Sequence, residues 1–282
     1  MSNTDTDWER RVLASIVDSI LAHPDAETQL VETLQWRGFL AIRNSDGVFL
    51  QTGNADADKK DISLLTGHTQ ADQDDLKSLS EILTIERLSD QDIAAHVSWS
   101  DSEGDNRQDE VRRILEIPSP TGMTPAGYDF KYWEQFRECQ YPYGLATEEL
   151  DLGVSLLVRA LPLICVPTRV SGHGITDRRR LYVEFDGPYA GAWFKAIFET
   201  RLANRLSQAE LFQIRFDNNR CSLEIGQQAD AFTAFRASQD LARLLIQPDV
   251  FKPIQKLKNQ ACLDWSRRFS PTEFYKHCIE CD

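Results

Sequence analysis

Residues 210–225 read Glu-Leu-Phe-Gln-Ile-Arg-Phe-Asp-Asn-Asn-Arg-Cys-Ser-Leu-Glu-Ile. Apolar and polar side chains alternate on both sides of Asp217-Asn218-Asn219. This pattern predicts a half-buried β-hairpin, because successive side chains of a strand point to opposite faces of a sheet. A helical pattern follows from about residue 229 to 246. The stretch therefore predicts a strand–strand–helix unit.

A second unit of the same kind precedes it. Residues 164–171 and 180–186 predict a hairpin, and Gly187-Pro188 begins a predicted helix that extends to about Leu206. Proline suits the first turn of a helix, where its missing N–H costs nothing. Residues 147–163 predict another helix, with Thr147 as its N-cap. Two hairpin–helix units favour an antiparallel sheet with helices on one face, which is the α+β class.

The first 120 residues predict a smaller, helix-rich domain that contains one β-hairpin. We expect helices over 8–21, 25–36 and 76–88, a hairpin over 39–50, and a long Asp-rich loop over 53–75. Prolines and glycines gather between residues 118 and 127, which is typical of a linker. We therefore predict two domains, residues 1–120 and 128–282.

Charge separates the same two parts of the chain. Residues 1–127 hold 11 Lys and Arg against 24 Asp and Glu, so their formal net charge of −13 equals that of the whole protein. Residues 128–282 hold 20 of each kind and are neutral overall. The acidic half would repel nucleic acid phosphates, so it favours a basic protein partner instead. Nucleic acid contact is left only to the C-terminal half.

The amino-acid composition excludes several classes of protein. An apolar fraction of 41% with 10% aromatic residues excludes a disordered chain. The sequence holds no apolar run of about 18 residues and its first residues lack the pattern of a signal peptide, so we expect a cytoplasmic protein without a membrane contact. Six cysteines in a chain of 282 residues do not form a secreted disulfide framework. We expect Cys165 and Cys221 to be buried strand thiols.

One cluster of polar residues suggests chemistry. Ser171-Gly172-His173-Gly174 leads into three arginines and a strand in which Glu184 and Asp186 share a face. A histidine, two carboxylates and several arginines can supply acid–base groups or bind a divalent metal with a phosphate. The alternative is a solvated hairpin with ordinary cross-strand ion pairs. The candidate catalytic residues are His173, Glu184 and Asp186, and the candidate anion-binding residues are Arg169, Arg178, Arg179 and Arg180.

The C-terminal region offers two further hypotheses. Cys278 and Cys281 have C-x-x-C spacing next to His277, and with Cys262 they form a candidate zinc site, against the alternative of incidental thiols on a terminal helix. Lys252, Lys256 and Lys258 interleave with aromatic residues in the tail. Such a mixture binds single-stranded nucleic acid by stacking, or packs a terminal helix onto the core.

No nucleotide-binding glycine loop or hydrolase motif is present in the sequence. Three functional hypotheses remain. The first is a non-catalytic interaction or adaptor protein whose acidic N-terminal half docks a basic partner or masks a nucleic-acid-binding surface. The second is an enzyme acting on a phosphate-containing substrate through His173, Glu184 and Asp186. The third is a ligand or nucleic-acid sensor.

Overall fold

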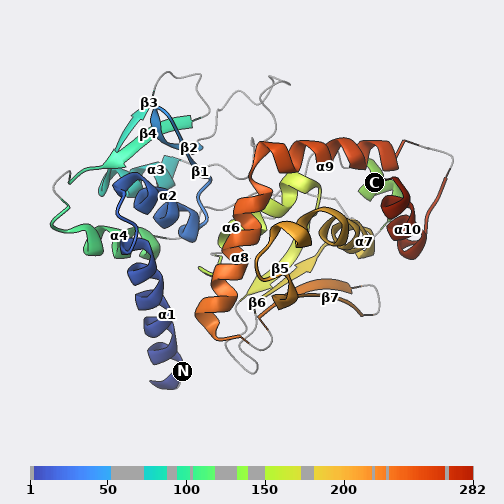
Figure 1. Ribbon diagram of the computed structural model, residues 1–282, viewed down its shortest axis with the longest axis horizontal. Helices are drawn as coiled ribbons and strands as arrows, with labels where there is room; N and C mark the ends of the chain where they lie inside the picture. The colour runs from blue at the N-terminus through green and yellow to red at the C-terminus, as the bar shows by residue number, and fades with distance from the viewer. Residues whose placement is uncertain are drawn as a thin grey trace.

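The computed structural model describes residues 3–51, 73–87, 94–101, 104–117, 132–138, 150–172, 181–217, 220–226, 229–263 and 267–281. These residues contain two four-stranded antiparallel sheets and the helices that pack on them (Figure 1). The predicted α+β class is confirmed.

The first sheet belongs to the N-terminal half. Helices α1 (Asn3–Leu21) and α2 (Ala26–Arg37) precede it, and α4 (Arg107–Glu116) follows it. The sheet has the order β1-β2-β4-β3, with α3 (Gln73–Ser80) between its two hairpins. Its strands are β1 (Ala41–Asn44), β2 (Gly47–Gln51), β3 (Leu83–Arg87) and β4 (Ala94–Trp99).

Local chemistry explains the ends of α2. The Asp25 carboxylate accepts a hydrogen bond from the Thr28 backbone N–H at 2.7 Å, so it satisfies a donor that the first helical turn leaves open. Hydrogen bonds from Thr28 lower the pKa of Asp25. Gly38 ends the helix in the left-handed region at φ 98°, which a side chain would disfavour. Gly38 is therefore the C-cap of α2.

The second sheet belongs to the C-terminal half and has the order β5-β6-β8-β7. Helix α7 (Pro188–Ile197) lies between its hairpins in sequence, and the described chain ends in α8 (Ala231–Leu245), α9 (Pro248–Ala261) and α10 (Pro271–Cys281). The short helices α5 (Trp133–Glu138) and α6 (Ser155–Ala160) come before the sheet. Its strands are β5 (Thr168–Gly172), β6 (Leu181–Phe185), β7 (Phe212–Asp217) and β8 (Arg220–Ile225). Both predicted strand–strand–helix units are present.

The two sheets share one topology. Each follows a helix, continues as hairpin, helix, hairpin and helix, and places its fourth strand between its second and third. The repeated unit is therefore larger than the strand–strand–helix element predicted from the sequence. We call residues 26–116, from α2 to α4, the first unit and residues 155–245, from α6 to α8, the second unit.

The apolar cores of the two units differ in extent. A small cluster lies between the first sheet and helices α2, α3 and α4. A much larger cluster contains the second sheet and its helices, and it also takes in Ile16, Val17 and Ile20 of α1 and Trp36 of α2. The Ser155 hydroxyl donates to the Trp36 carbonyl at 3.3 Å, which ties α6 to α2. The first two helices thus contact the second unit, and a domain boundary near residue 120 stays a prediction.

Several sequence predictions were wrong in detail. Residues 76–88 do not form one helix: α3 ends at Ser80, and residues 83–87 pair with β4. The helix predicted over 147–163 begins at Ser155, and Thr147 lies outside the described residues. Cys165 is buried but does not lie in a strand, because it adopts the left-handed conformation at φ 61° after a 3₁₀ turn. Cys221 is a buried strand thiol, as predicted.

Candidate functional site

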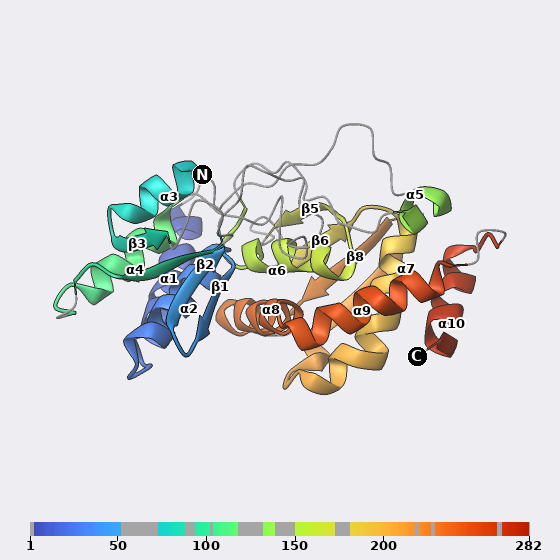
Figure 2. The ribbon, with the colours of Figure 1, turned by 90° about the horizontal axis from the view of Figure 1, so that it is seen from above.

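The second sheet has one apolar face and one polar face. Leu181, Val183 and Phe185 of β6 are buried in the larger core, whereas Tyr182 and Glu184 between them are partly exposed. Helices α7 and α8 contact the sheet (Figure 2), and the Phe185 ring packs on Phe194 of α7 at 5.0 Å. The alternation predicted for residues 182–186 therefore places Glu184 on the face opposite the helices.

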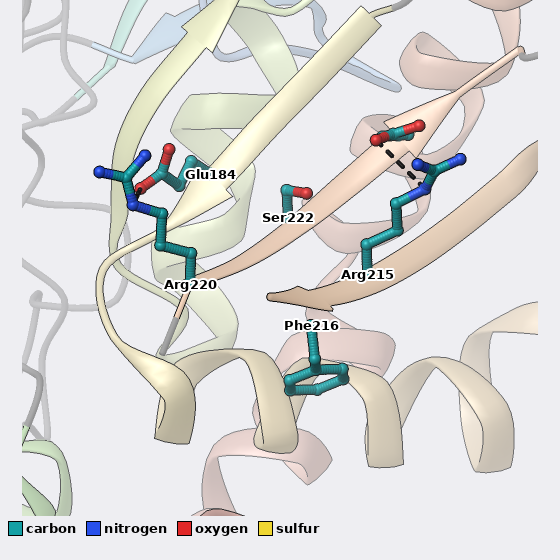
Figure 3. Close-up of a pocket in the computed structure, with 6 residues that line it drawn as sticks. Glu184, Arg215, Phe216, Arg220 and Ser222 are labelled. Carbon is teal, nitrogen blue, oxygen red and sulfur yellow. Dashed lines mark ion pairs between the residues drawn. The ribbon is translucent and has the colours of Figure 1, made fainter. Parts of the chain in front are cut away.

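That polar face is hollowed where β6, β8 and β7 lie side by side. The hollow has a volume of about 500 Å³, and Figure 3 shows the residues that line it. The strand register sets Ser222 of β8 opposite Glu184 of β6 on one side and opposite Arg215 of β7 on the other. The lining residues are Glu184, Arg215, Phe216, Arg220, Ser222 and Glu224.

Ion pairs connect the charged residues of the hollow. Arg215 Nε lies 3.2 Å from Glu224 Oε1, and Arg220 Nε lies 3.9 Å from Glu184 Oε1. The Arg220 side chain is 70% exposed, so water screens its pair with Glu184. Two carboxylates thus meet two guanidinium groups in the hollow. This arrangement suits binding of a ligand with charged groups better than it suits acid–base chemistry.

The predicted site lies only partly within the described residues. His173, Arg178, Arg179 and Arg180 lie outside the described residues. Glu184 lines the hollow, whereas Asp186 and Arg169 do not. The Asp186 backbone N–H donates to the Pro167 carbonyl at 2.9 Å, just beyond the end of β6.

Four residues of the hollow were not predicted from the sequence: Arg215, Arg220, Ser222 and Glu224. A signal for them was present, because they alternate with apolar residues in the hairpin 210–225. Strand alternation assigns each of them to the polar face. It does not give the strand order, and only the pairing of β8 with β6 brings them next to Glu184.

The predicted zinc ligands do not gather around one point. Cys278 faces the core and is 1% exposed, whereas Cys281 is exposed and lies 3.6 Å from His277 Nε2. Burial raises the pKa of the Cys262 thiol to about 11 and raises the pKa of Cys278 as well, which disfavours the thiolate form that binds zinc. Within the described ranges, no three His, Cys, Asp or Glu side chains are placed to hold a metal ion. Metal binding stays a prediction.

Three aromatic residues and one lysine of the tail serve packing. Phe251, Phe269 and Phe274 are buried in the larger core. Lys258 is 1% exposed, and its ammonium donates to the Phe136 carbonyl at 2.9 Å. These four side chains are therefore not available to stack on bases or to contact phosphates.

The carboxylates of the N-terminal half fall into two groups, those that form ion pairs within the protein and those that do not. Its paired acids are Asp25 and Glu27 with Arg43, Glu110 with Arg107, and Glu32 with Arg243 of the second unit. Other carboxylates are exposed and form no ion pair with a described residue. These unpaired acids are Asp18, Asp46, Glu81, Asp105, Asp109 and Glu116.

Comparison with known proteins gives no relative for this chain: no protein-family model, curated protein or solved structure matches it. Within the part of the chain that the structure describes, every helix is too short or too polar to cross a lipid bilayer.

Proposed function

We propose that the protein is a non-catalytic interaction protein of the cytoplasm whose acidic N-terminal half docks a basic protein partner. One observation carries the proposal: the formal net charge of −13 lies wholly within residues 1–127, and the rest of the chain is neutral. An excess of one sign on one part of a protein accelerates and selects encounters with a partner of the opposite sign.

The environment of the described carboxylates supports this reading. Asp105, Asp109 and Glu116 belong to α4 and the turn before it, Glu81 follows α3, and Asp46 lies in the turn between β1 and β2. All five are exposed. A carboxylate that has no internal ion pair keeps its charge available for a cation on another molecule.

The enzyme hypothesis has weaker support. Glu184 shares a hollow with two arginines, as a phosphate-binding enzyme would require. Its carboxylate is nevertheless paired with Arg220, and the described residues that line the hollow include neither a histidine nor a cysteine. A general acid or base must be free to exchange a proton with the substrate, whereas both glutamates of the hollow are held in ion pairs with arginines. We therefore place the enzyme second.

A titration tests the proposal directly. The full-length protein is titrated into a fluorescently labelled peptide rich in lysine and arginine, and anisotropy gives the dissociation constant. We expect binding at about 0.05 M salt and clear weakening at about 0.5 M, because added salt shortens the range of electrostatic attraction. Absence of binding at low salt, or binding that salt leaves unchanged, would contradict the proposal.

Matched charge variants locate the binding surface. Glu81→Gln with Glu116→Gln removes two exposed carboxylates of the first unit, and Glu210→Gln with Glu280→Gln removes two exposed carboxylates of the C-terminal half. The net charge changes equally in both double variants. We expect the first to weaken peptide binding about three- to tenfold and the second to have little effect. Equal weakening would mean that only the total charge matters, and the docking surface would be refuted.

A further inference from the structure

Strand β7 is an edge of the second sheet with few features that protect it from pairing. It has six residues, Phe212–Asp217, and pairs with β8 along its whole length in a regular register. Among the described strands none pairs with its other side. The outer side of an edge strand presents backbone N–H and C=O groups that can pair with another chain.

The other sheet edges differ from β7. Strand β1 has only four residues, and Arg43 on it forms ion pairs with Asp25 and Glu27. The register of β5 shifts between Thr168 and Val170, and such a bulge interrupts further pairing. Strand β3 is one residue shorter than β7 and ends with Glu86 and Arg87. Among these edges, β7 is the longest and is regular.

An exposed aromatic side chain marks this edge. Phe216 is 49% exposed, and although it borders the hollow, its ring points toward α7 (Figure 3). Strand alternation places Phe212 and Ile214 on the same side as Phe216. The ammonium of Lys195 lies 5.9 Å from the centre of the Phe216 ring. The edge thus combines an apolar row with open backbone groups.

We propose that β7 pairs with β7 of a second copy of this chain in antiparallel orientation, so that the second sheets of the two copies join into one. Such a contact is an isologous dimer interface with a two-fold axis. When the two-fold axis is perpendicular to the joined sheet, the helices of both copies cover the same face of that sheet. Residues that lie opposite each other across the two β7 strands then point to the same face.

The sequence of β7 selects one register. With Ile214 opposite itself, Phe212 lies opposite Phe216, and Gln213 lies opposite Arg215 of the second copy. With Arg215 at the centre, two arginines would be opposed, which is unfavourable. With Gln213 at the centre, Phe216 would lie beyond the end of the partner strand. The register centred on Ile214 opposes no like charges and sets the exposed Phe216 of each copy opposite the partly buried Phe212 of the other.

The mass of the full-length protein in solution tests the dimer. We expect twice the chain mass of 32.2 kDa in sedimentation or light scattering at about 100 μM. Phe216→Lys is expected to give the single-chain mass, because it places a charge in the apolar row. Ile42→Lys is the matched control, since Ile42 is also 49% exposed on an edge strand but belongs to the first sheet. A single-chain mass for the unaltered protein overturns the proposal, as does an equal loss of dimer in both variants.

Two substitutions at Gln213 test the register while leaving the core intact. Gln213→Lys would face Arg215 of the second copy at two symmetric positions and weaken the dimer about fivefold, whereas Gln213→Glu would strengthen it about fivefold. Inside one copy Gln213 is opposite Glu224. Gln213→Lys would therefore raise the melting temperature of the single chain, and Gln213→Glu would lower it. A shift of the dimer dissociation constant in the same direction for both variants overturns the register.

Discussion

The first and second units have the same order of helices and strands but different cores and surfaces. The first encloses a small apolar cluster and belongs to the half of the chain that carries the net charge of −13. The second is part of a large cluster, and the carboxylates in its hollow are each paired with an arginine. The shared topology therefore depends on the apolar side chains that face the helices. The outward-facing side chains can differ between the two units without changing it.

The largest expected difference concerns equivalent core valines. Val48 of β2 and Val183 of β6 both lie in the second strand of their sheets and are 1% and 0% exposed. Val183→Ala is expected to lower the free energy of unfolding by about 2 kcal/mol, and Val48→Ala by about 1 kcal/mol, because a small cluster relaxes more easily around a cavity. Urea denaturation measures both. A larger loss of unfolding free energy for Val48→Ala than for Val183→Ala would contradict the idea that the small cluster relaxes more easily than the large one.

The contact between the units is the next test. Arg243 of α8 lies 3.1 Å from the Glu32 carboxylate and donates to the Gln35 side chain at 2.8 Å, and both of these α2 residues are buried. Arg243→Met is expected to cost about 1–2 kcal/mol, since it leaves buried acceptors unsatisfied.

The control for Arg243 is Arg220→Met. Arg220 also pairs with a glutamate but is 70% exposed, so we expect a change below about 0.5 kcal/mol. Urea denaturation of the two variants gives the comparison. Equal losses would show that α2 and α8 do not depend on this contact.

The last test concerns the N-cap of α8. The Asp230 carboxylate accepts a hydrogen bond from the Thr233 N–H at 3.0 Å, and hydrogen bonds from Thr233 lower the pKa of Asp230. Asp230→Ala is expected to cost about 1 kcal/mol at pH 7. Because the folded-state pKa is depressed, this stabilisation is present above the unfolded-state pKa and is lost as pH falls through the folded-state pKa.

Urea denaturation of the unaltered protein and of Asp230→Ala at several pH values measures that loss. The difference between them should remain constant above about pH 5 and shrink below about pH 4. A difference that persists unchanged into strong acid would mean that Asp230 does not act through its charge.

Sequence patterns predicted the elements that depend on local contacts. Strand alternation located the hairpin 210–225, and the helix expected over 25–36 agrees with α2 (Ala26–Arg37). The same reasoning failed at residues 76–88, because the apolar spacing there fits a helix as well as a strand. Residues 83–87 become a strand only through pairing with β4, whose residues come later in the chain.

The candidate site shows the same limit. Glu184 was singled out from the sequence, and alternation gave its face correctly. Its neighbours Arg215, Arg220, Ser222 and Glu224 come from another hairpin about 30 to 40 residues away. No local pattern connects two hairpins, so the hollow depends on the order of strands in the sheet.

The sequence by itself determined the α+β class, the apolar face of each main strand and the uneven charge of the two halves, because side-chain polarity and spacing act over a few residues. Tertiary structure decided that both halves share one topology, that α1 packs with the second unit, and that β7 is left at an edge. These features depend on pairing between distant segments, for which no short stretch of residues contains the information.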